Sequence, residues 1–171
     1  MDLRLGTPRR PVAGIMGAAD AAPERIADAE RLGELLAEQG WIVLTGGRPF
    51  GVMEAASRGA KRVAGSLTIG IMPTADEVPS AFVDVAIRTD LGHGRNNVNV
   101  LSSDVVFACG VEGPGTASEV ALALKNGRPI VLVAPSEAAR QFFTELGGDR
   151  VQVVESGEAA AAVARAFLTS R

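Results

Sequence analysis

Two glycine-rich segments are the parts of this sequence best suited to chemistry. Gly113-Pro114-Gly115-Thr116 and Gly46-Gly47-Arg48-Pro49-Phe50-Gly51 each follow an apolar run and lead into a predicted helix. A helix N-terminus offers unpaired N–H groups and the positive end of a dipole. Glycine lets a ligand approach that backbone closely. We therefore expect an anion, in particular a phosphate, to bind there, with the Thr116 hydroxyl and the Arg48 guanidinium as added donors.

The named nucleotide-binding motifs are absent. Gly46 and Gly51 have the spacing of a P-loop, but Val52-Met53 stands where Lys-Ser/Thr is required. The first apolar run ends in Gly14-Ile15-Met16-Gly17 rather than in G-x-G-x-x-G. We therefore do not expect ordinary ATP hydrolysis or NAD binding. The alternative to a phosphate site is that these loops are only tight turns between strands and helices.

Thr116-Ala117-Ser118-Glu119 has the spacing of a helix capping box. In that motif the threonine caps the helix and the glutamate, three residues later, bonds back to it. Capping is the favoured interpretation of both residues. In the alternative, Glu119 lies near the ligand, where it holds a hydroxyl or amine or acts in acid–base chemistry.

A second polar cluster, Gly94-Arg95-Asn96-Asn97-Val98-Asn99, begins another predicted helix. It is either a solvated helix start or a second anion clamp built on Arg95. Asp20 either caps the first helix, which is favoured, or binds a ligand hydroxyl. The sequence has one cysteine, Cys109, and one histidine, His93, so neither a disulfide framework nor a His- or Cys-based zinc site is expected.

The elements that must position these residues alternate between strands and helices. Strands are predicted at 11–16, 41–45, 67–72, 82–87, 104–109, 129–133 and 151–154, and helices at 23–39, 51–60, 96–103, 116–126, 137–146 and 158–168. Several strands are continuously apolar, which predicts a doubly wound, Rossmann-like α/β fold: a mostly parallel sheet with helices on both faces. We expect a single domain over residues 1–171, with 1–10 flexible.

Ligands of such sheets bind at the carboxyl ends of the strands, so we place the candidate site in the loops that follow the strands. The predicted binding residues are Gly17, Ala18, Thr45, Gly46, Gly47, Arg48, Gly51, Val52, Met72, Arg95, Asn96, Gly113, Pro114, Gly115, Thr116 and Glu119.

Composition limits the partners. The 171 residues are 47% hydrophobic, and Asp plus Glu, at 20, exceed Lys plus Arg, at 17. With this balance we expect no nucleic acid and no membrane as partner. Because no apolar run has the length of a signal-peptide core or of a spanning helix, we expect a cytoplasmic location. The helix at 116–126 is apolar around most of its circumference, which predicts a homo-oligomer built on that surface. The rival interpretation is that the helix at 158–168 covers it within one chain.

These motifs also resemble a known superfamily. Leu44-Thr45-Gly46-Gly47-Arg48 followed by Gly51-Val52-Met53 is similar to the second-strand signature of the Lonely Guy/lysine-decarboxylase-like (SLOG) Rossmann proteins. Gly113-Pro114-Gly115-Thr116-x-x-Glu119 resembles their P-G-G-x-G-T-x-x-E signature. The nearer likeness, from Gly14 to about Phe143, is to the molybdenum cofactor carrier proteins of that superfamily.

The resemblance implies a carrier of molybdenum cofactor, an anionic pterin dithiolene with a terminal phosphate. The dithiolene holds the metal, so the protein would ligate none. It also implies dimers or tetramers and, as possible partners, molybdoenzymes that receive the cofactor.

The alternative implied by the same superfamily is a nucleoside 5′-monophosphate phosphoribohydrolase of the Lonely Guy type. Glu119 and Arg95 would then be its catalytic residues. However, the segment after Arg95 reads Asn96-Asn97-Val98-Asn99 and lacks the acid and lysine partners of those enzymes. This departure favours a carrier over a hydrolase. A nucleotide-binding sensor with neither activity is the third interpretation.

Overall fold

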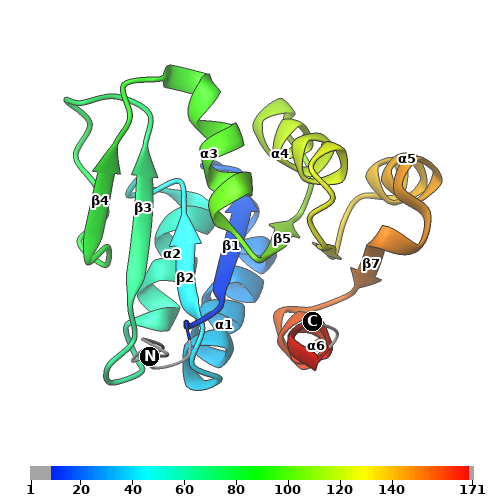
Figure 1. Cartoon of the computed structure of the whole chain (residues 1–171), viewed down its shortest axis with the longest axis horizontal. Coiled ribbons are helices and arrows are strands. Elements are labelled where there is room, and N and C mark those ends of the chain that lie inside the picture. The colour runs from blue at the N-terminus through cyan, green and yellow to red at the C-terminus, as the bar shows by residue number, and fades with distance from the viewer. Residues whose placement is uncertain (1–8, 170–171) are drawn as a thin grey trace, which may run out of the picture.

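The fold was obtained as a computed structural model and is described for residues 9–169. The expected flexible segment, 1–10, falls mostly outside these residues. Seven parallel strands form one sheet in the order β4-β3-β2-β1-β5-β6-β7 (Figure 1). Their bounds are β1 Val12–Gly17, β2 Ile42–Thr45, β3 Thr68–Met72, β4 Val85–Arg88, β5 Val105–Cys109, β6 Ile130–Val133 and β7 Val151–Val154. The predicted Rossmann-like α/β class is confirmed.

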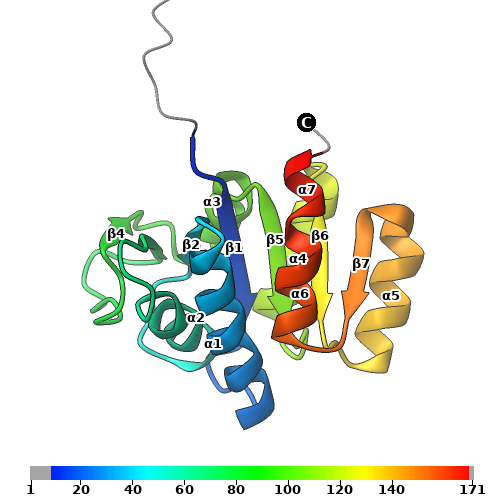
Figure 2. The same cartoon turned by 90° about the horizontal axis from the view of Figure 1, so that it is seen from below.

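Helices cover both faces of this sheet, as Figures 1 and 2 show. One face carries α1 (Pro23–Glu38), α2 (Gly51–Ala60) and α6 (Gly157–Ala164), and the other carries α3 (Arg95–Ser102), α4 (Pro114–Lys125) and α5 (Glu137–Gly147). The short elements are η1 (Gly92–Gly94), η2 (Gly148–Arg150) and α7 (Ala166–Thr169). Right-handed crossovers between parallel strands produce such a layered arrangement.

The sheet separates two apolar cores. Leu32, Trp41 and Phe107 lie in the core beneath α1, α2 and α6. Met16 and Leu132 lie in the core on the α3, α4 and α5 side. The central strands are buried on both faces, which explains why they read as unbroken apolar runs.

Helices α1 and α2 pack with unusually close backbones. A Cβ atom on Gly33 would collide with the carbonyl oxygen of Ala56, and one on Gly59 with that of Glu30. Only glycine fits at these two contacts without moving a helix. The packing fixes the start of α2 beside the end of β1, where Val52 N donates to Ala18 O at 3.1 Å.

The ends of several elements differ from the predictions. The edge strand begins at Val85 rather than at Phe82, because Asp84 is held by Lys61 and by the backbone of Thr68. Helix α4 begins at Pro114, not Thr116, and its N-cap is Gly113.

Two capping predictions are therefore wrong. Thr116 lies inside the first turn of α4, so it cannot be the cap of a capping box. The N-cap of α1 is Ala22, without a side-chain hydrogen bond, so Asp20 does not cap that helix.

The C-terminal helices do not cover α4. The segment predicted at 158–168 is divided into α6 and α7, and α6 packs against α1 on the opposite face of the sheet (Figure 2). The rival explanation for the apolar surface of α4, cover by the C-terminal helix at 158–168, is wrong. No helix in residues 9–169 combines the length and apolar character needed to cross a membrane.

Candidate functional site: a cleft at the switch point of the sheet

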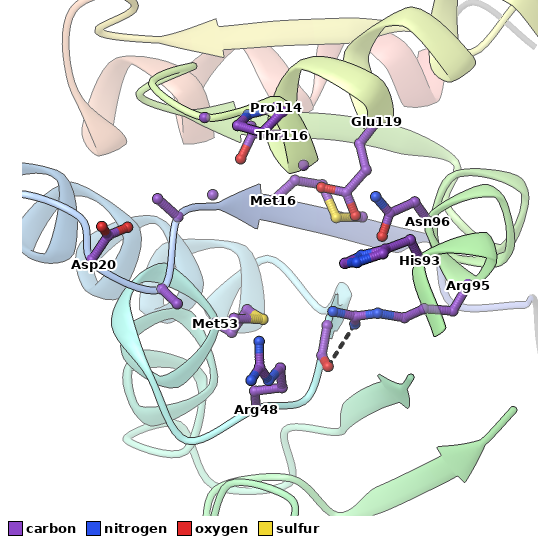
Figure 3. Close-up of a pocket in the computed structure, with 16 residues that line it drawn as sticks. Met16, Asp20, Arg48, Met53, His93, Arg95, Asn96, Pro114, Thr116 and Glu119 are labelled. Carbon is purple, nitrogen blue, oxygen red and sulfur yellow. Dashed lines mark hydrogen bonds between the residues drawn. The ribbon is translucent and has the colours of Figure 1, made fainter. Parts of the chain in front are cut away.

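The strand order reverses beside β1, since the chain winds outward from β1 to β4 and then returns to β5. Gly17 at the end of β1 pairs with Cys109 at the end of β5, and the following loops diverge. A cleft of about 260 Å³ opens there (Figure 3). Crevices at such switch points are where open parallel sheets bind ligands. Its lining residues are Met16, Gly17, Ala18, Ala19, Asp20, Gly46, Arg48, Met53, His93, Arg95, Asn96, Gly113, Pro114, Gly115, Thr116 and Glu119.

The N-terminus of α4 forms one wall of the cleft. Gly113 is extended, with φ −136°, and no side chain caps the helix. Pro114 has no N–H, and the amides of Gly115 and Thr116 lie in the first turn, where intrahelical acceptors are lacking. A Cβ atom built on Gly113 or Gly115 would have nothing within 4 Å. The space in front of these amides is therefore open to a ligand.

Arg95 joins α3 to the opposite wall. Its Nη1 donates to Gly46 O and Ile71 O, both at 2.6 Å. A Cβ atom on Gly46 would collide with the guanidinium, so glycine is what allows this approach. Burial lowers the pKa of Arg95, while the carboxyl of Glu119 raises it. Nη1 of Arg95 thus holds the loop after β2 in place, and the positive charge of its guanidinium lies at the cleft wall.

Arg48 contributes a second positive charge on the same side. Its Nε lies 3.0 Å from a carboxylate oxygen of Glu77, and its guanidinium carbon lies 5.7 Å from the centre of the Phe50 ring. The side chain is 36% exposed. A half-exposed arginine paired with one carboxylate can turn toward an anion without leaving a buried charge behind.

Glu119 is the most perturbed acid of the cleft. It is only 7% exposed, and its Oε1 accepts a 2.8 Å hydrogen bond from Asn99 Nδ2. Burial raises the pKa of Glu119 to about 7, although the bond from Asn99 and the charge of Arg95 both lower it. Such a carboxyl is a candidate functional group rather than a cap.

Asn96, which also lines the cleft, makes a second link between α3 and α4. Its Nδ2 lies 3.0 Å from Ser118 Oγ, which donates to Gly115 O at 2.6 Å. Together with the Asn99–Glu119 bond, this contact fixes α3 against the first turns of α4.

Eleven of the sixteen predicted binding residues line the cleft. The other five do not line it: Thr45, Gly47, Gly51, Val52 and Met72. Thr45 Oγ1 accepts from Gly47 N at 3.0 Å, and Met72 is fully buried. Gly51, with φ +53°, faces the Ala18 carbonyl closely. These residues shape the loops rather than the cleft surface.

The structure adds five residues to the lining: Met16, Ala19, Asp20, Met53 and His93. Met16 reads as part of a buried strand and Met53 as part of the buried face of a helix, so the sequence does not mark either one as a cleft residue. His93 could have been found from its position two residues before Arg95. Asp20, which had been considered mainly as a cap, lies on the loop after β1.

No metal site is formed by protein side chains within residues 9–169. No group of three or more His, Cys, Asp or Glu side chains there could hold an ion. Cys109 is buried at the end of β5, and its burial raises the pKa of the thiol to about 12. It is therefore an inert thiol at neutral pH.

Comparisons with known proteins agree with this architecture. The molybdenum cofactor binding protein of the phototrophic bacterium Rippkaea orientalis is 46% identical and superposes with a TM-score of 0.89, over 95% of this chain and 99% of that one. The molybdenum cofactor carrier protein of Chlamydomonas reinhardtii is 44% identical, with a TM-score of 0.89 over 95% and 100% of the two chains.

A relative from Archaeoglobus fulgidus, described only as an uncharacterized protein, is 42% identical over 134 residues, which are 77% of this chain and 87% of that one. The model of the SLOG cluster4 family matches residues 10–163. The resemblance to SLOG proteins inferred from the glycine-rich motifs is thereby confirmed, and the chain belongs to the SLOG cluster4 family.

Proposed function

We propose that this protein binds and carries molybdenum cofactor in the cleft at the carboxyl edge of its sheet. The observation that carries the proposal is the similarity to two molybdenum cofactor binding and carrier proteins over 95% of this chain. In this proposal the glycine-rich loops that line the cleft supply the contacts.

The cleft suits the chemistry of that ligand. The open amides at the start of α4 match a terminal phosphate, because unpaired N–H groups and the helix dipole both favour an anion. Arg48 and Arg95 supply positive charge for the rest of an anionic ligand. The dithiolene sulfurs of the cofactor hold its own metal, so binding requires no metal ligand from the protein.

Hydrolysis of nucleoside monophosphates is the competing function for the same cleft. Its candidate catalytic pair would be Glu119 and Arg95. In this structure Arg95 Nη1 is engaged by two backbone carbonyls and Glu119 by Asn99, a neighbour on α3. One nitrogen of Arg95 and one oxygen of Glu119 are therefore held by the protein, and the remaining polar atoms of the pair are available to bind a ligand.

We call the open amides of Gly115 and Thr116 at the start of α4 the phosphate cradle. A negative charge introduced there tests the proposal. Gly115→Glu introduces a carboxylate where a side chain meets nothing, so the fold is expected to survive. Gln141→Glu is the matched control, since it adds the same charge at an exposed position on α5. Binding of molybdenum cofactor at 100 times its Kd should stabilise the wild type and the control by about 2.7 kcal/mol.

The Gly115→Glu variant should lose most of that stabilisation, because its carboxylate repels the phosphate. Undiminished stabilisation of this variant would remove the α4 amides from the site. If AMP stabilises the wild type and adenine is released, the result would contradict the carrier function and support the hydrolase.

We further propose that the protein is a homo-oligomer whose dimer unit is built on α3 and α4. Leu101 on α3 is 45% exposed, and Ala121 on α4 is exposed beside the half-buried Leu122. Since α6 lies on the other face of the sheet, it does not cover these side chains. A symmetric contact between copies is the simplest cover. A cytoplasmic location and delivery to molybdoenzymes complete the proposal.

A further inference from the structure

We propose that Glu119, held in place by Asn99, is the specificity-determining residue of the cleft and accepts the paired N–H donors of a 2-amino-4-oxopyrimidine ring. This is the ring of a pterin, so the inference rests on the proposed function and deepens it. The ring N–H and the neighbouring amino group lie side by side and point the same way. They present a carboxylate with a fork of two donors, as an arginine guanidinium does.

The position of Glu119 places it beyond the phosphate cradle. It follows Thr116 by three residues on α4, which is about 4.5 Å along the helix axis. Figure 3 shows its side chain pointing from α4 into the cleft, on the side where Asn96 and His93 also lie. A ligand whose phosphate sits on the first turn of α4 can therefore bring a ring toward this carboxyl.

Around Glu119 and Asn99 there are more hydrogen-bond acceptors than protein donors. Asn99 is fully buried, and its Nδ2 donates to one oxygen of Glu119. Asn99 Oδ1 is buried and has no hydrogen-bond partner among residues 9–169. The second oxygen of Glu119, Oε2, accepts no hydrogen bond from this part of the chain and, unlike Asn99 Oδ1, is not among its enclosed atoms. Glu119 lines the cleft and Asn99 does not, so the geometry assigns to the Glu119 carboxylate the donors that a ligand supplies.

The arrangement discriminates between rings. A lumazine ring has a carbonyl in place of the 2-amino group, and its oxygen would face the carboxylate. The Watson–Crick edge of adenine offers one donor and one acceptor, so AMP also fails to match. Sites that pair buried polar groups with a ligand's donors reject analogues lacking those donors far more strongly than apolar sites reject a missing methylene.

A matched pair of ligands and a matched pair of variants test the assignment. The ligands are 6-hydroxymethylpterin phosphate and its deaminated analogue, 6-hydroxymethyllumazine phosphate, whose binding is followed by their fluorescence. Glu119→Gln keeps the shape and the acceptor for Asn99 but replaces the second oxygen with a donor. Glu112→Gln, at an exposed position in the loop before α4, removes the same charge outside the cleft.

The wild type and Glu112→Gln should bind the pterin phosphate at least tenfold more tightly than the lumazine phosphate. In Glu119→Gln this ratio should fall to about one, while sulfate, which probes only the phosphate cradle, should bind as well as before or better. The pterin affinity of the wild type should also rise as pH increases through about 7, because the carboxylate is the accepting form. This dependence should be weaker in Glu119→Gln, in which only the phosphate of the ligand titrates.

The outcomes separate the two levels of the proposal. A wild-type protein that binds neither phosphate ligand overturns the proposed function and the ring assignment together. A pterin preference that persists in Glu119→Gln, or that is absent from the wild type, overturns the assignment to Glu119 and leaves the phosphate cradle standing.

Discussion

Glu119→Gln is expected to stabilise the unliganded protein at alkaline pH and to change little at acid pH. The carboxyl has an ordinary pKa of 4.5 and a folded-state pKa of about 7, mainly because it is buried. The folded protein therefore binds this proton more tightly than the unfolded chain does. The stability contributed by the protonated form is fully present below pH 4.5 and is lost as pH rises through about 7.

The magnitude follows from the shift. Each pKa unit corresponds to 1.36 kcal/mol, so the difference between 4.5 and about 7 is equivalent to about 3 kcal/mol in the free energy of unfolding. A neutral glutamine keeps the acceptor for Asn99 and has no charge to bury. It should therefore remove this pH-dependent cost.

Urea denaturation at a fixed protein concentration measures the effect. The difference in unfolding free energy between Glu119→Gln and wild type should grow from near zero at about pH 4.5 to about 3 kcal/mol at about pH 8. Glu112→Gln should show no comparable growth, since Glu112 is exposed. A constant difference across this range, or a variant less stable than wild type at about pH 8, would refute the account of Glu119 as a buried acid of raised pKa.

Further predictions concern packing, binding, catalysis and assembly. Gly33→Ala should lower the free energy of unfolding by about 1–3 kcal/mol, because the added Cβ meets the backbone of α2, whereas Gly94→Ala should be nearly neutral in the same denaturation assay. Arg48→Glu should weaken cofactor binding by about 1.5–3 kcal/mol in titration calorimetry, through loss of a charge-assisted contact. Chromatography should detect no steady release of adenine from AMP by the wild type. Leu101→Lys should reduce the mass measured by light scattering, because it places a charge in the proposed subunit contact.

Each of these has a contrary result. Equal stability of Gly33→Ala and Gly94→Ala would mean that α1 and α2 are not packed backbone to backbone. Unchanged affinity in Arg48→Glu would remove that residue from the site. Steady adenine release that Glu119→Ala abolishes would establish the hydrolase. A wild-type mass near 17.6 kDa would refute the oligomer.

The sheet was predictable because its signals are local. Continuous apolar runs such as Val105–Cys109 require burial on both faces, and only a parallel sheet between helix layers provides it. The carboxyl ends of parallel strands share one edge, so the sequence alone assigns the glycine loops after β1, β2 and β5 to one site.

The start of α4 was mispredicted because two valid signals compete there. Pro114 suits the first helical position, while Thr116 with Glu119 has the spacing of a capping box. The sequence does not reveal that Glu119 is held by Asn99, 20 residues earlier on another helix. That contact depends on how α3 packs against α4, which no local pattern encodes.

The inward or outward orientation of individual loop residues was also beyond prediction. Thr45 and Met72 end strands at the correct edge, but they point into the protein. Met53 was assigned to a core helix face, yet it reaches the cleft. Such differences depend on the angle at which each loop leaves the sheet.

The central claim is tested most directly by the amount of molybdenum cofactor that the protein retains. The cofactor is released anaerobically from a denatured molybdoenzyme and mixed with the purified protein, and the protein is then passed through a desalting column. Molybdenum is measured by elemental analysis and the pterin by fluorescence after oxidation. The account predicts about one molybdenum and one pterin per chain in the wild type and in Gln141→Glu, and much less of both in Gly115→Glu. Retention of neither by the wild type, or equal retention by all three proteins, would contradict it.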